Sequence, residues 1–288
     1  MSQTRTGQFG IGFRRGGGAW QKDTDVLIAW AKENDFACID LRADLDDIRR
    51  VTDAGLAVGS VDLPDGRGMI SPDEGRRAEA VAANGELIRA AKGLAKNFFV
   101  VMLPEKPDLP RQENFAYMTD SFGKLAGVLS ECDARIVIEG WPGPGALCCT
   151  PETVRAFLDQ VASPTMGLNY DPSHLIRMGI DPLRFLREFV DRVGHIHGKD
   201  TELLSQRQYE LGCEQPATFA ERIGFGGNHW RYTIPGHGQM RWSAALRILA
   251  GAGYDGMISI ELEDANFNGT EEGEKQGLIL ARRFLEGC

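Results

Sequence analysis

The feature that most limits the fold of this chain is a regular alternation between short apolar runs and amphipathic stretches. The apolar runs have strand length and are rich in β-branched and aromatic residues, whereas the stretches between them have helical periodicity. The predicted strands cover residues 9–13, 38–41, 57–61, 98–103, 135–139, 166–171, 193–197 and 257–261. The predicted helices lie near 23–34, 44–53, 72–92, 112–132, 151–161, 181–191, 242–252 and 271–286. Eight such repeats predict an α/β fold, a single (β/α)₈ TIM barrel over residues 1–288.

An open doubly wound sheet would show the same alternation locally. Sheets of that kind that bind dinucleotides carry the pattern G-x-G-x-x-G between the first strand and the first helix. The segment here is Arg14-Arg15-Gly16-Gly17-Gly18, which does not match that pattern. The number of repeats and the missing pattern therefore favour the closed barrel.

One connection is much longer than the others. Residues 200–241 contain no strong periodic segment and include the glycine-rich stretches 224–228 and 235–238. Long irregular connections in compact domains usually serve function. A connection after the seventh strand lies over the carboxyl face of a barrel, so we expect this insert to act as a partial lid over the active site.

Each of the last four predicted strands ends in a side chain that can bind a metal. Glu139 ends the fifth, Asp171 the sixth, His197 the seventh and Glu261 the eighth. In a parallel barrel these ends meet at one rim, so three carboxylates and one imidazole can converge. Such an oxygen-rich set predicts one divalent ion, Mn²⁺ foremost, with Mg²⁺, Co²⁺ or Zn²⁺ as alternatives.

The histidines strengthen this prediction, because all five fall between residues 174 and 237. His174 follows Asp171 by three residues and is expected at the same rim. His195 and His197 share a strand face by the two-residue period. We interpret His195 as a core residue with a hydrogen-bond partner and His197, nearer the carboxyl end of its strand, as the ligand.

Composition excludes several classes of protein. A formal net charge of −9 disfavours nucleic acid as a partner, and no apolar run approaches the length of a membrane span. The amino terminus has no secretory pattern, and six cysteines without metal or redox spacing indicate reduced thiols. We therefore expect a cytoplasmic protein that acts on a small molecule, and the formation of a homo-oligomer stays open.

Five strings in the second half of the chain resemble those of one family. They are Ile138-Glu139, Asp171-Pro172-Ser173-His174, His195-Ile196-His197-Gly198-Lys199-Asp200, Pro235-Gly236-His237-Gly238 with Trp242, and Ser259-Ile260-Glu261. The chain resembles the xylose-isomerase-like sugar phosphate isomerase/epimerase superfamily, which includes ketose 3-epimerases and endonuclease IV.

The resemblance implies the metal ligands Glu139, Asp171, His197 and Glu261. It also implies that Glu139 and Glu261 form the acid/base pair and that His174 holds substrate oxygens. Two departures from the epimerases stand out: Lys199-Asp200-Thr201 replaces an acidic residue followed by an arginine, and His237 replaces an acidic residue in the Pro-Gly-x-Gly turn.

The chemistry predicted for this set is proton abstraction next to a sugar carbonyl through an enediolate, as in a metal-dependent sugar or sugar phosphate isomerase/epimerase. The further candidates for binding substrate are Lys199, His229, Arg231 and His237. The alternatives are a metal-dependent dehydratase or lyase acting on a keto-sugar or 3-keto-glycoside, and a non-catalytic sugar-binding subunit. An endonuclease-IV-like activity is disfavoured by the acidic charge and the absence of histidines from the first half.

Overall fold

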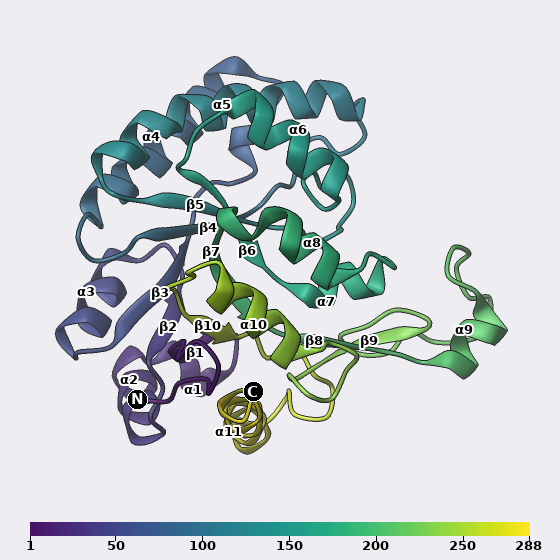
Figure 1. Cartoon of the computed structure of the whole chain (residues 1–288). Coiled ribbons are helices and arrows are strands. Elements are labelled where there is room, and N and C mark those ends of the chain that lie inside the picture. Colours follow the sequence, from purple (N-terminus) through teal and green to yellow (C-terminus); the bar gives the residue numbers. More distant parts are fainter. The chain divides into compact units, whose positions relative to one another are not determined.

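Eight parallel strands close into a barrel in a computed structural model that describes all residues, 1–288 (Figure 1). Their order around the barrel is β1-β10-β7-β6-β5-β4-β3-β2. The strands are β1 (Ile11–Arg14), β2 (Cys38–Leu41), β3 (Ala57–Asp62), β4 (Asn97–Val101), β5 (Arg135–Glu139), β6 (Met166–Tyr170), β7 (Val193–Gly198) and β10 (Ile258–Ile260). All eight predicted strands are confirmed to within a few residues.

The helices between these strands begin at residues that the sequence marks as caps. Asp23, Asp44 and Asp73 accept hydrogen bonds from the first free backbone N–H groups of their helices, and Pro151 stands in the first turn of α6. The longer helices are α2 (Thr24–Glu33), α3 (Leu45–Asp53), α4 (Glu74–Ala90), α5 (Arg111–Glu131), α6 (Pro151–Val161), α8 (Pro182–Phe189), α10 (Trp242–Gly251) and α11 (Glu271–Glu286). Each corresponds to a predicted helix.

Shorter elements were not predicted. They are α1 (Ala19–Lys22), α7 (Pro172–Arg177) and the single 3₁₀ turns η1 (Gly68–Ile70) and η2 (Val190–Arg192). The expectation of an irregular insert is wrong for part of residues 200–241, which contain two strands and a helix. Strand β8 (Asp200–Leu203) pairs antiparallel with β9 (Trp230–Thr233), and α9 (Ser205–Leu211) lies at the far end of this hairpin in Figure 1.

Contacts along the chain define two compact units. The first comprises Met1–Cys38, Asp171–Glu188 and His197–Cys288, and the second comprises Ile39–Tyr170 and Phe189–Ile196. In the first unit, the rings of Phe13, Trp30 and Phe36 pack with centroids 4.9–5.6 Å apart. In the second, Phe122 packs edge-on against Phe157. No helix is both long enough and apolar enough to cross a membrane.

Candidate functional site

Asp171 directly follows β6 and presents its two carboxylate oxygens to different partners. Oδ1 accepts hydrogen bonds from the backbone N–H of Ser173 at 2.9 Å and from its hydroxyl at 2.6 Å, which caps α7. Oδ2 lies 3.3 Å from His174 Nε2 and 4.0 Å from His197 Nδ1. The cap fixes the carboxylate while leaving the second oxygen for a cation, so capping and binding are compatible roles for one side chain.

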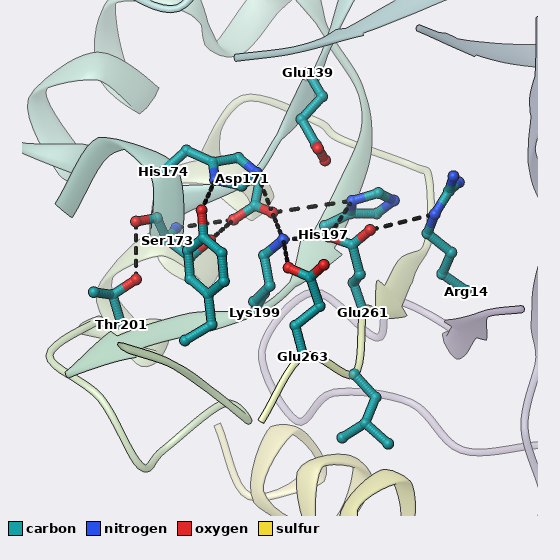
Figure 2. A network of polar contacts seen from close by, with 12 residues as sticks. Arg14, Glu139, Asp171, Ser173, His174, His197, Lys199, Thr201, Glu261 and Glu263 are labelled. Atoms are coloured by element: carbon teal, nitrogen blue, oxygen red, sulfur yellow. Dashed lines mark hydrogen bonds and ion pairs between the residues drawn. The ribbon is translucent and has the colours of Figure 1, made fainter. Parts of the chain in front are cut away.

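Glu261 and His197 lie beside this oxygen (Figure 2). His197 is fully buried on β7, and its Nδ1 is 3.4 Å from Oε2 of Glu261, the residue that follows β10. Ligand atoms of Asp171, His174 and Glu261 also lie within 4.8 Å of one another. Two carboxylate oxygens and an imidazole nitrogen match the donors that Mn²⁺, Co²⁺ or Zn²⁺ accept, so these residues fit a divalent metal.

A side-chain cation contacts the same oxygens. Lys199 is 1% exposed, and its ammonium lies 3.2 Å from Asp171 Oδ2, 3.0 Å from Glu263 Oε2 and within hydrogen-bonding distance of Glu261 Oε2. On the other side of Glu261, Arg14 Nε is 3.3 Å from Oε1. Positive charge therefore gathers around the two carboxylates with which a metal would pair, as Figure 2 shows.

Replacing Lys199 with methionine should destabilise the metal-free protein by about 3 kcal/mol, because the substitution leaves three clustered carboxylates with one cation fewer. Saturating Mn²⁺ should restore more stability to the variant than to the wild type. Thermal melts in a chelator and in Mn²⁺ measure both effects. The control is Lys275→Met, whose exposed partner Glu271 lies 2.6 Å away and whose loss should cost less than about 1 kcal/mol. Equal melting temperatures for Lys199→Met and wild type in chelator would contradict this interpretation.

Glu139 lies in the second unit, where it ends β5. It is 3% exposed, and its Oε2 accepts a hydrogen bond from Asn169 Nδ2 at 2.9 Å. Asn169 is its register partner on β6 and precedes Asp171 by two residues. A buried carboxylate thus stands at the carboxyl end of β5 next to the strand that leads into Asp171.

His174 is held by a residue that the sequence did not reveal. Its Nδ1 lies 2.7 Å from the hydroxyl of Tyr232, which belongs to β9 in the insert. Tyr232 is buried, and the ammonium of Lys199 lies 4.6 Å from the centre of its ring. Glu263 was also missed, although its spacing of two residues from Glu261 could have indicated a shared direction.

Three predicted substrate-binding residues have other surroundings. Arg231 Nε pairs with Glu202 across the β8–β9 hairpin at 2.6 Å, and His237 is exposed with its ring 6.1 Å from that of Phe267. His229 is buried on the insert, where its carbonyl accepts a hydrogen bond from Leu204. No hydrogen bond or ion pair joins these three to Asp171 or Glu261, so their contact with a substrate stays a prediction.

The acidic residue that follows Lys199 is Asp200, and its carboxylate is held by several hydrogen bonds. Its carboxylate accepts hydrogen bonds from the backbone N–H groups of Thr201 and Met240 at 2.8 Å and of Gly236 at 3.3 Å, and from the indole of Trp242 at 3.3 Å. Burial raises the pKa of Asp200, and the hydrogen bonds oppose that rise. The residue holds the Pro-Gly-x-Gly turn to β8 and has a structural role.

His195 matches the prediction of a core histidine. It is fully buried in the second unit, where its Nε2 lies 2.9 Å from Oδ2 of Asp40 on β2. His195, two residues before His197, is therefore a buried core residue of the barrel.

Comparison with known proteins places the chain in a family. Residues 28–286 match the family model described as a xylose isomerase-like TIM barrel. The chain is 35% identical over 123 residues to YfiH of Bacillus subtilis (strain 168), an alignment that covers 41% of this chain and 37% of YfiH. It is 25% identical over 184 residues to inosose dehydratase of Clostridium tetani (strain Massachusetts / E88), covering 63% of this chain and 57% of that protein. The matches thus span less than two thirds of either relative.

Solved structures share the fold at low sequence identity. The apo form of 3-keto-D-glucoside 4-epimerase, YcjR, from E. coli superposes with a TM-score of 0.71 at 14% identity, covering 97% of this chain and 100% of that one. The IolI protein with a bound zinc atom gives a TM-score of 0.65 at 16% identity, covering 96% and 95%. At these identities the likeness shows the fold alone.

Proposed function

The chain belongs to the xylose isomerase-like TIM barrel family, and we propose that it is a metal-dependent enzyme that isomerises or epimerises a small sugar or sugar phosphate. One observation carries the proposal: Asp171, His197 and Glu261 converge at the carboxyl ends of β6, β7 and β10. Active sites of parallel barrels lie at this end of the strands. The family membership supports the same reaction class.

We propose that Glu139, Asp171, His197 and Glu261 hold the ion, with Mn²⁺ as the foremost candidate. A divalent ion there would supply Lewis-acid stabilisation of negative charge on the substrate oxygens. Asp171 suits this role because Ser173 fixes its Oδ1 and so orients Oδ2. Glu139 is oriented in a similar way by Asn169. Preorganised ligands of this kind bind a metal without reordering their side chains.

The chain's own carboxylates would move the proton. Glu261 and Glu139 are the proposed pair, one removing a proton next to the substrate carbonyl and the other returning it to the opposite face. Arg14 and Lys199 both contact Glu261, and the ionised carboxylate is the form that a base requires. Lys199 and His174 would then donate hydrogen bonds to substrate oxygens.

The insert is proposed to shield this reaction from water. Its β9 already contacts the site through Tyr232, and residues His229, Arg231 and His237 would approach a substrate through movement of the insert. Excluding water would strengthen the electrostatic interactions of the site.

A dehydratase is the second candidate, because a relative of 25% identity is an inosose dehydratase. Elimination of a substituent β to the carbonyl begins with the same proton abstraction. The arrangement of the carboxylates serves both reactions, so only the products separate them.

Deuterium exchange tests the proposed function. The Mn²⁺-loaded protein would be incubated in D₂O with panels of ketoses, their phosphates, inososes and 3-keto-glycosides, and the products analysed by NMR and mass spectrometry. We expect deuterium next to the carbonyl of one substrate class, in an epimer or isomer of the starting sugar. An unsaturated product one water lighter would establish the dehydratase. Tight binding of a sugar without exchange would contradict both and favour a sugar-binding subunit.

A further inference from the structure

The last helix, α11, exposes apolar side chains on the side that faces water. Its inner side packs against β1 and β10, where Leu278, Ala281 and Leu285 are buried. On the outer side, Leu280 is 36% exposed, and Phe284, one turn later, is 39% exposed. Surface helices of globular proteins carry charged and polar residues on this side, and contiguous exposed apolar side chains mark contact sites.

The exposed apolar residues border a groove between α11 and α2. Both helices lie on the outside of the first unit (Figure 1). Trp30 of α2 forms the apolar part of the groove together with Ile279 and Leu280 of α11. Charged residues border this part, among them Glu272 near the start of α11 and Arg283 near its end. An apolar centre with a polar rim is the usual anatomy of a protein–protein interface.

Glu272 and Arg283 have opposite charges at opposite ends of the groove. They are eleven residues apart, which is about three helical turns and about 16 Å along the axis, so both side chains lie on the same side of α11. Neither side chain forms an ion pair or hydrogen bond within the chain, whereas Glu271 and Lys275 pair with each other at 2.6 Å. Both charges suit the dipole of their own helix, but the dipole does not account for the apolar residues between them.

We propose that the α11 face, defined by Trp30, Glu272, Ile279, Leu280 and Arg283, is the contact between two copies of this chain. When two α11 helices pack antiparallel about a twofold axis, Glu272 of each copy faces Arg283 of the other. Ile279 and Leu280 then meet their counterparts near the axis. The two helix dipoles are opposed in this arrangement, which is also favourable.

The charges of the α11 face favour a second copy over an unrelated partner. Two chains with a net charge of −9 repel each other at long range, so their association requires local complementarity. The twofold axis supplies it twice, because it repeats the contact between Glu272 and Arg283. A partner with a surface of one charge sign would instead meet like charge at one end of the groove.

Charge reversal tests the proposal on the full chain. The variants are Arg283→Glu, Glu272→Arg and the double variant that carries both changes. Each single change places like charges against each other at both ends of the interface, whereas the double variant restores opposite charges. Arg247→Glu is the matched control, because it changes the net charge as Arg283→Glu does and alters an exposed arginine of α10 that does not line the groove.

Sedimentation equilibrium gives the dissociation constant of each variant, and circular dichroism verifies that each is folded. We expect dimers for wild type and Arg247→Glu, a dissociation constant about 10²-fold higher for each single reversal, and recovery of most of this loss in the double variant. A monomeric wild type would overturn the proposal. A dimer that Arg283→Glu leaves unchanged, or that the double variant does not restore, would overturn it as well. The measurement needs neither metal nor substrate, so its outcome is independent of the proposed function.

Discussion

Replacing Glu261 with glutamine should reduce the metal content from about one equivalent per chain to near zero and lower proton exchange by at least about 10³-fold. The change removes the carboxylate that faces His197, Lys199 and Arg14, and with it both a proposed ligand and the proposed base. An amide has almost the same shape, so the effect would arise from charge and basicity. Elemental analysis and the deuterium-exchange assay measure the two losses.

Glu263→Gln is the matched control for this experiment. Glu263 also contacts Lys199, at 3.0 Å, but it is not a proposed ligand. Its variant should therefore retain about one equivalent of metal. Equal metal content in Glu261→Gln and wild type would remove Glu261 from the ligand set. Equal loss of metal in Glu261→Gln and Glu263→Gln would show that the net charge of the carboxylate cluster governs metal binding, and not one ligand.

Replacing Asp200 with alanine should destabilise the protein by about 3–5 kcal/mol and lower the melting temperature by about 10 °C. The substitution leaves three backbone N–H groups and the indole of Trp242 without their common acceptor in a fully buried position. Denaturant and thermal unfolding with circular dichroism detection measure the change.

Asp200→Asn provides the milder comparison, because its amide oxygen keeps one acceptor of the same size and should recover part of the stability. Below the unfolding transition, Asp200→Ala should still bind about one equivalent of Mn²⁺, since its carboxylate serves the turn and not the metal. Loss of metal from the folded Asp200→Ala variant would show that the turn supports the site more directly than its contacts indicate.

The barrel could be predicted because its determinants are local. Each strand is a short apolar run and each long helix has its own amphipathic period, with caps such as Asp23 and Pro151 marking the starts. The positions of Glu139, Asp171, His197 and Glu261 at strand ends could be predicted for the same reason. The end of each apolar run is visible in the sequence itself. Parallel closure then directs these ends to one face.

The hairpin in the insert and the contacts of its residues could not be predicted, because they depend on pairing between distant segments. Strands β8 and β9 contain charged and polar residues and do not form the apolar runs by which the barrel strands were predicted. Lys199 was predicted to bind substrate, but nothing in the sequence shows that its ammonium lies against Asp171 and Glu263. Arg231 was also predicted to bind substrate, and the contact that the structure shows for its side chain is with Glu202.

The most direct test of the central claim is the position of the metal in crystals grown with Mn²⁺, located by anomalous scattering. We predict one strong peak per chain, contacted by carboxylate oxygens of Glu139, Asp171 and Glu261 and by a ring nitrogen of His197. A site of that composition would establish the ligand set from which the proposed proton transfer follows. Crystals saturated with Mn²⁺ that show no peak among these residues, or a peak only elsewhere on the chain, would contradict the account.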